Sequence, residues 1–250
     1  ALQSIPYAAE DFFLHNELWH SFDFHSDMSR ISLKESISLA NRQQTLLYDT
    51  LHRANFCFLT LGTAWVYIYN STDRIVANCH KLPQQHFSKR LLSIEEIGES
   101  LTRIAQLLKQ INPSIHLVIT ISPVRHIKDG FLENQVSKSQ LFSALYPLIT
   151  SGYYTYFPAY ELLLDELRDY RFYANDMVHP SEMAINYIWG RLVASYIDTA
   201  TQMDMKQAES IQKALLHRPF KPDTEKHQQF LIQLQQKMEV FTMKYPHIKF

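Results

Sequence analysis

Apolar residues recur along the first 200 positions in two alternating patterns. Stripes with helical spacing predict helices over residues 32–53, 93–111, 137–149, 160–169 and 181–196. Between these stripes lie short, nearly continuous apolar runs, at residues 55–62, 116–123 and 152–158. Runs of this kind are typical of strands that are buried on both faces of a parallel sheet. The alternation therefore predicts a three-layer α/β/α domain with a parallel sheet.

Two parts of the chain depart from this alternation. Short apolar segments at 65–69 and 74–77 are separated by the polar sequence 70–73, which predicts a β-hairpin. Beyond about residue 200, two helices are expected at 203–216 and 223–244, the second rich in glutamine. We therefore expect an α/β domain over residues 1–200 and a helical extension over 201–250. The extension carries no recognisable chemistry, and we expect its helices to pack on the domain or on a partner.

Composition and charge exclude several classes of function. The 250 residues carry 24 Lys and Arg against 25 Asp and Glu, interspersed, for a net charge of −1. No basic face suited to nucleic acid or to a membrane surface is expected, and without an apolar run of 18 residues no membrane-spanning helix is predicted. Two cysteines are too few for a disulfide framework. No glycine-rich phosphate loop is present, so a nucleotide is disfavoured and no cofactor is predicted.

A candidate catalytic pair lies near the end of the α/β domain. Asp176 precedes His179 by three residues, and Pro180 and Ser181 follow where the last helix of the domain should begin. At this spacing the carboxylate and the imidazole can lie on the same side of the backbone. A carboxylate that holds one imidazole nitrogen leaves the other free to act as a general base. The pair therefore predicts the acid–base half of a hydrolase.

Polar side chains follow two of the predicted strands, at the carboxyl edge of the sheet, where ligand sites form in open α/β folds. Gly62 and Thr63 end the first of these strands and Trp65 comes next, while Arg125 and His126 follow the second strand. The glycine allows a ligand to approach the backbone, and the other side chains offer hydrogen-bond donors and a stacking surface. Together with the acid–base pair, they predict a pocket for a polar substrate.

Histidines are concentrated near the N-terminus, where His15, His20 and His25 recur every five residues. This spacing fits neither one face of a helix nor the usual spacing of zinc ligands, so no metal site is predicted. The favoured interpretation is polar residues that line an edge or a pocket wall. We assign His20, with His80 further along the chain, to the wall of the predicted pocket. A metal-dependent hydrolase that uses the histidine-rich segment ranks third among the functional hypotheses.

Several short sequences within residues 8–197 resemble, in order, the motifs of the GSCFA domain family. They are 19–23 (WHSFD), 61–67 (LGTAWVY), 76–81 (VANCHK), 122–126 (SPVRH), 167–173 (LRDYRFY) and 176–181 (DMVHPS). That family in turn resembles the SGNH, or GDSL-like, hydrolases. The resemblance implies a flavodoxin-like α/β/α fold and ester hydrolysis by a Ser-His-Asp triad. His179 would then be the general base and Asp176 the carboxylate that orients it.

The sequence departs from the family pattern in two places. The family's nucleophile is the serine of a Gly-Ser-Cys-Phe-Ala motif, and none of the five glycines here is followed by serine. We expect this serine to lie upstream of residue 1. SGNH enzymes also carry Gly-x-Asn-Asp where this chain has Gly-Thr-Ala-Trp at 62–65, so the asparagine that donates to the oxyanion is missing. Thr63, Arg125 and His126 are the candidates to replace it.

Two functional hypotheses of different classes follow. The leading one is a serine esterase that acts on O-acyl groups, such as acetyl groups, of a carbohydrate or a similar small ester. The alternative is a non-catalytic α/β module that binds a glycan or a protein through the same pocket. Alanine at His179 separates the two, because a binding module has no turnover to lose.

Overall fold

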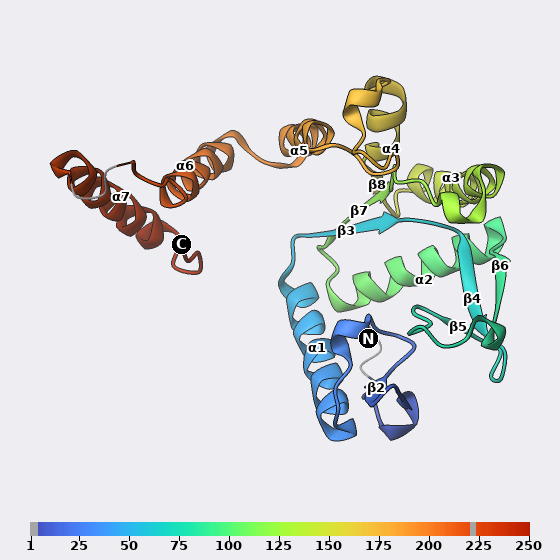
Figure 1. Ribbon diagram of the computed structural model, residues 1–250. Coiled ribbons are helices and arrows are strands. Elements are labelled where there is room, and N and C mark those ends of the chain that lie inside the picture. The colour runs from blue at the N-terminus through green and yellow to red at the C-terminus, as the bar shows by residue number, and fades with distance from the viewer. Residues whose placement is uncertain (1–4, 221–223) are drawn as a thin grey trace. The chain divides into compact units, whose positions relative to one another are not determined.

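The structure, a computed structural model, describes residues 5–220 and 224–250 (Figure 1). Contacts divide the chain into two units, which meet between Ile185 and Asn186 inside helix α5 (Glu182–Tyr196). The first unit contains the sheets and the candidate site. The second contains α6 (Thr199–Leu215) and α7 (Glu225–Lys244).

A parallel sheet forms the centre of the first unit. Its strands are β3 (Phe56–Leu61), β7 (His116–Ile121) and β8 (Thr155–Tyr156), in the order β3-β7-β8. In the register of the sheet, Phe58 lies opposite Val118 and Ile119 lies opposite Tyr156. The predicted α/β architecture with a central parallel sheet is confirmed. Strand β8 is shorter than the strand predicted over 152–158, because Gly152 belongs to the turn after α3 and Pro158 has no N–H to donate.

Two long helices cover one face of this sheet. They are α2 (Ile94–Ile111) and α3 (Phe131–Thr150), and they pack against each other as well as on the strands. A capping box begins α2: Ser93 Oγ accepts the Glu96 N–H, and the Glu96 carboxylate accepts the Ser93 N–H. The apolar core between the helices and the sheet includes Leu101, Leu108, Leu117, Ile119, Ile121, Leu141 and Leu145. This packing fixes the carboxyl ends of β3 and β7, where loops leave the sheet.

Helix α3 begins six residues before the start predicted from the apolar pattern. Its first residues, Phe131 and Leu132, are 76% and 70% exposed, so their apolar character does not mark the buried face. The buried side chains of the first two turns are polar instead: Asn134, Ser137 and Lys138. A helix with this inverted pattern gives no apolar stripe from which its start could be predicted.

An antiparallel sheet follows β3 in the sequence. Strand β4 (Trp65–Tyr69) lies between β5 (Arg74–Val76) and β6 (Phe87–Leu91), the last preceded by the 3-10 turn η3 (Gln84–His86). The predicted hairpin at 65–77 is confirmed, and Asp73 takes the left-handed conformation that its turn requires, with a φ of 53°. Strand β6 was not predicted. It places Lys89 opposite Tyr67, close to the loop that leaves β3.

The N-terminal part of the unit is built on α1 (Leu33–Arg53). The short strands β1 (Phe13–His15) and β2 (Leu18–His20) form a hairpin that contacts this helix, flanked by the 3-10 turns η1 (Ala9–Asp11) and η2 (Ser26–Met28). Ser32 caps α1, because its Oγ accepts the Glu35 N–H.

The segment between β8 and α5 differs from the single helix predicted over 160–169. One helical turn, α4 (Ala159–Glu161), continues into a π-helical turn, η5 (Leu162–Glu166), in which the Leu167 N–H reaches the Leu162 carbonyl. A 3-10 turn, η6 (Tyr170–Phe172), follows. The wider π turn is accompanied by burial of Leu162, Leu163 and Leu167.

The second unit has a small core of its own. Helices α6 and α7 pack against each other around Ile211, Leu234 and Phe241. They overlap the two helices predicted at 203–216 and 223–244, although residues 221–223 lie outside the described residues. Among the described residues, no helix is both long enough and apolar enough to cross a membrane.

Candidate active site

Asp176 and His179 form the predicted pair within one tight turn. The Asp176 Oδ1 atom accepts the N–H groups of Val178 and His179, each at 2.9 Å, and Oδ2 lies 2.6 Å from His179 Nδ1. Met177 adopts a φ of 60°, a left-handed conformation that allows the chain to turn back on the carboxylate. The carboxylate therefore holds both the backbone and the imidazole of the residue three positions later.

The turn is fixed to its surroundings by backbone hydrogen bonds. Tyr173 and Pro180 form an isolated antiparallel bridge, and the Ala174 N–H donates to the His179 carbonyl at 2.8 Å. Ser181 Oγ donates to the Arg171 carbonyl. These contacts hold the turn just before α5 and present the side chains of the pair to solvent.

The electrostatics of the pair suit a general base. The N–H of His179, its imidazole and the N–H of Val178 lower the pKa of Asp176 to about 2, so the carboxylate stays ionised at neutral pH. An ionised carboxylate accepts a hydrogen from Nδ1, which places the only ring hydrogen of a neutral imidazole there and leaves Nε2 as an acceptor. Within the described residues Nε2 has no hydrogen-bond partner, and the His179 side chain is 62% exposed.

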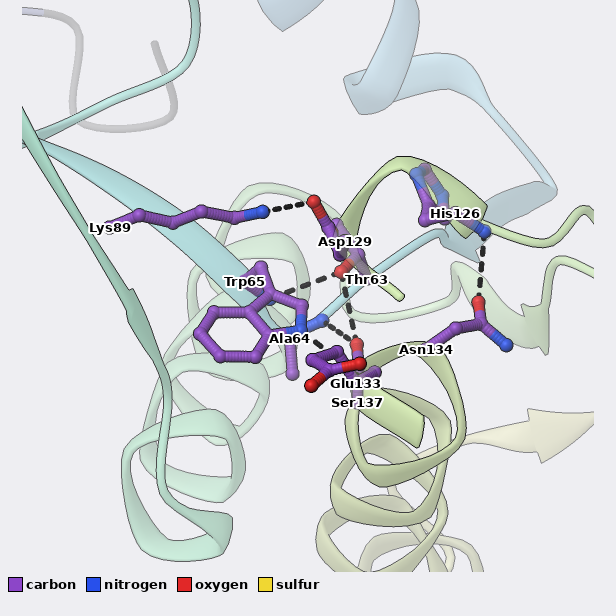
Figure 2. A network of polar contacts seen from close by, with 9 residues as sticks. All are labelled: Thr63, Ala64, Trp65, Lys89, His126, Asp129, Glu133, Asn134 and Ser137. Atoms are coloured by element: carbon purple, nitrogen blue, oxygen red, sulfur yellow. Dashed lines mark hydrogen bonds and ion pairs between the residues drawn. The ribbon is translucent and has the colours of Figure 1, made fainter. Parts of the chain in front are cut away.

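A second cluster joins the loops that follow β3 and β7 (Figure 2). Ser137 Oγ accepts the Ala64 N–H at 2.7 Å and lies 3.0 Å from Thr63 Oγ1, which in turn accepts the Trp65 N–H at 3.1 Å. The Trp65 indole donates to the Glu133 carbonyl at 3.2 Å. Both contacts come from the first two turns of α3. The Gly62–Trp65 turn is thus attached to this helix by side-chain and backbone polar groups.

Lys138 bonds to both loops, the one after β3 and the one after β7. Its ammonium donates to the carbonyls of Gly62 and Ser122, each at 2.6 Å, and the residue is only 1% exposed. Burial lowers the pKa of Lys138 to about 8. One buried side chain therefore holds the residues that directly follow β3 and β7.

His126 and an ion pair complete this cluster. The His126 N–H donates to Asn134 Oδ1 at 2.9 Å, and its ring lies against Gly62, where a Cβ atom would come within 3.4 Å of Nε2. Lys89 pairs with Asp129, and its ammonium also lies 5.1 Å from the centre of the Trp65 ring. The predicted residues Gly62, Thr63, Trp65 and His126 are thus brought together.

Arg125 and Tyr173 both act electrostatically on Tyr160. Burial raises the pKa of Tyr160, and Tyr173 is among the groups that raise it further. Arg125 lowers this pKa. Tyr160 therefore lies within electrostatic range of both the loop after β7 and the residue that bridges to Pro180. The cluster around Gly62 lies in the loops after β3 and β7, and the acid–base pair lies in the turn between η6 and α5.

His20 and His80 occupy a different environment. Both residues are buried, and their rings are tilted by 40° against each other with centroids 4.6 Å apart. His20 contacts Ser29 Oγ at 2.6 Å and the His15 carbonyl at 3.1 Å, while His80 contacts the Ser21 carbonyl at 2.7 Å and Ser26 Oγ at 3.2 Å. All four ring nitrogens are therefore engaged by the protein, which leaves none of them to contact a substrate.

Two protein-family models match this chain. The family model described as the GSCFA family matches residues 1–192, about three quarters of the chain. The chain belongs to the GSCFA family. A second model, the C-terminal domain of GSCFA domain proteins, matches residues 208–250 of this GSCFA protein. No curated protein and no solved structure matches the chain.

Three site residues of this GSCFA protein were missed by the sequence analysis: Asn134, Ser137 and Lys138. Their spacing, i, i+3 and i+4, places them on one face of a helix, which is the available signal. It was missed because polar residues at these positions are usually solvated. Within the described residues, no group of three or more His, Cys, Asp or Glu side chains is arranged to hold a metal ion.

Proposed function

We propose that this GSCFA protein is an ester hydrolase of the SGNH type, with His179 as its general base and Asp176 as the carboxylate that orients it. The observation that carries the proposal is the 2.6 Å contact between Asp176 Oδ2 and His179 Nδ1, in a turn that leaves the His179 side chain 62% exposed. The same carboxylate accepts the His179 backbone N–H, so the imidazole is held at two points. This is the arrangement that a Ser-His-Asp triad requires of its base.

The proposed reaction uses the pair in two steps. The hydroxyl of the nucleophilic serine loses its proton to His179 Nε2 as its oxygen attacks the ester carbonyl, and Asp176 stabilises the resulting imidazolium. His179 then gives this proton to the leaving alkoxide as the acyl–oxygen bond breaks. Water repeats the sequence on the acyl-enzyme and releases the carboxylic acid.

We propose that the nucleophile is the serine of the family's Gly-Ser-Cys-Phe-Ala motif, in a part of the protein outside the 250 residues. Within them, the glycines at 62, 98, 130, 152 and 190 are followed by Thr, Glu, Phe, Tyr and Arg. Residues 1–250 alone should then bind substrate without turning it over by the triad.

The side chains near the Gly62–Trp65 turn favour a small polar ester, such as an O-acetylated carbohydrate. Trp65 and Tyr67 offer ring faces, and the Lys89 ammonium lies 5.1 Å and 5.5 Å from their centroids. Arg125 adds an exposed donor on the neighbouring loop. Aromatic faces beside charged donors suit a ligand that presents both apolar and hydroxyl-bearing surfaces.

The test is hydrolysis of p-nitrophenyl acetate, and then of acetylated sugars, by the full-length gene product. His179→Ala should abolish turnover above the background set by binding and oxyanion stabilisation. His25→Ala is the matched control, because His25 also contacts a nearby carboxylate, at 3.2 Å from Asp27, in an exposed turn. Equal turnover in the wild type and in His179→Ala would overturn the proposal, and binding of an acetylated sugar without any turnover would favour the binding module.

A further inference from the structure

The chain needs oxyanion donors other than the asparagine of SGNH enzymes. Ala64 stands at the position of that asparagine, is fully buried, and gives its N–H to Ser137 Oγ. The Thr63 hydroxyl oxygen is used inside the turn, where it accepts the Trp65 N–H and contacts Ser137 Oγ. Neither side chain is therefore placed to serve a substrate oxygen.

Lys138 sets the direction of the peptide group between Gly62 and Thr63. The Gly62 carbonyl points to the buried ammonium at 2.6 Å. In a trans peptide the carbonyl and the following N–H point in opposite directions, so the Thr63 N–H points away from the lysine. Within the described residues this N–H has no hydrogen-bond partner. It is a backbone donor at the carboxyl end of β3, the edge at which substrates bind in open parallel sheets.

His126 lies beside the same peptide group. Its ring rests against Gly62, at 3.4 Å from the position that a Cβ atom would occupy. The backbone N–H of His126 donates to Asn134 Oδ1. Neither ring nitrogen of His126 has a partner in the part of the chain that the structure describes, and the side chain is exposed.

The charges around His126 favour a neutral ring. Partial burial of the His126 ring lowers its pKa, Lys138 and Lys89 lower it further, and Asp129 opposes them. A neutral imidazole carries one N–H and can donate it without acting as an acid. Neutral imidazole is a suitable electrophile for a developing oxyanion when nearby positive charge disfavours its protonation.

We propose that the Thr63 N–H and the His126 imidazole together form the oxyanion site of this protein, and that Lys138 is the positioning residue that orients the Thr63 N–H. This inference rests on the proposed esterase function. As the serine oxygen bonds to the ester carbon, the carbonyl oxygen gains negative charge and accepts both hydrogen bonds. When the carbonyl re-forms and the alkoxide leaves with the proton from His179, the donors keep their hydrogens. His126 transfers no proton in this scheme.

The kinetic test compares His126→Ala with His116→Ala in the full-length protein. His116 is an exposed histidine at the amino end of β7, so its removal is a matched control at the opposite edge of the sheet. We expect His126→Ala to lower kcat by about 10²–10³-fold with KM changed little, and His126→Gln to recover part of the loss by supplying an N–H. His116→Ala should match the wild type. If His179→Ala abolishes turnover while His126→Ala retains full kcat, the oxyanion assignment is wrong and the proposed function stands.

A second measurement does not depend on turnover. The ring of His126 can be titrated by NMR in the wild type, in Lys138→Met and in Asp129→Asn. We expect Lys138→Met to raise the pKa of His126 and Asp129→Asn to lower it, because the two variants remove charges of opposite sign. Absence of turnover in the wild type with both shifts present would overturn the proposed function while retaining the placement of His126. Identical titrations in all three proteins would overturn the placement of the His126 ring near the charges of Lys138 and Asp129.

Discussion

The burial of Lys138 predicts how the free energy of unfolding depends on pH. The Lys138 residue is 1% exposed, and its ammonium has two carbonyls as partners. Its pKa is about 8 in the folded protein and 10.5 in the unfolded protein, so the amine is harder to protonate in the folded state. A shift of that size corresponds to about 3 kcal/mol. The unfolded state therefore binds more protons than the folded state between pH 8 and pH 10.5, and the contribution of Lys138 to stability rises with pH across this window.

Replacement of Lys138 by methionine removes this dependence on pH. The variant loses two hydrogen bonds but no longer has an ammonium to desolvate, so the two effects oppose each other at neutral pH. The free energy of unfolding of the wild type, relative to that of Lys138→Met, should rise by about 2.5 kcal/mol between pH 7 and pH 10. Groups common to both proteins, such as Tyr154 with its pKa raised to about 12 by burial, cancel in this difference.

The assay is urea unfolding of both proteins at unit steps of pH from 7 to 10. Lys128→Met is the control, because Lys128 is exposed in the neighbouring turn η4 (Ile127–Asp129) and should follow the wild type at every pH. A difference between the wild type and Lys138→Met that stays constant over this range would refute the reasoning. It would mean that the ammonium is solvated in the folded protein.

Three further predictions concern other parts of the molecule. Asp176→Asn should lower kcat by about 10³–10⁴-fold, because an amide can hold the wrong tautomer of His179, and steady-state ester hydrolysis measures this. Burial keeps the pKa of His80 below 6.5, so stability should fall as pH drops below that value, and thermal unfolding of His80→Asn should lose part of this acid sensitivity. Asn112→Ala should cost about 2–4 kcal/mol in urea unfolding, because the buried Asn112 amide donates to the carbonyls of Leu51 and Ala54 and its oxygen accepts the Ser114 N–H.

The elements of the α/β fold that could be predicted are those whose buried side is apolar. Helices α1 and α2 begin within one residue of the expected position, because a serine cap and an apolar stripe coincide in each. Strands β3 and β7 were predicted from continuous apolar runs. Strand β6 was missed because its sequence, Phe-Ser-Lys-Arg-Leu, is half exposed and pairs only at an edge of the small sheet. Its position depends on pairing with β4, which local sequence does not specify.

In the candidate site, too, some contacts could be predicted from the sequence and others could not. The contact between Asp176 and His179 was predicted because both residues belong to one turn, and three residues of separation limit how far apart they can lie. The position of His20 and His80 was not predicted, because it depends on the packing of two segments that are 60 residues apart in sequence. Their pairing with serines and carbonyls makes them a buried structural pair, a role that the number and spacing of histidines do not indicate.

Polar burial at the start of α3 links the fold to the proposed chemistry. Asn134, Ser137 and Lys138 each satisfy a backbone group in a loop that leaves the sheet, and Leu141, one turn further, returns to the apolar core. The helix thus changes its inner face from polar to apolar where it passes from the loops to the strands. A buried lysine reduces stability at neutral pH, and an apolar residue of similar size would avoid this cost while leaving the Gly62 peptide free to rotate. The presence of a charge at this buried position is therefore best explained by the orientation that its hydrogen bonds impose on the two loops.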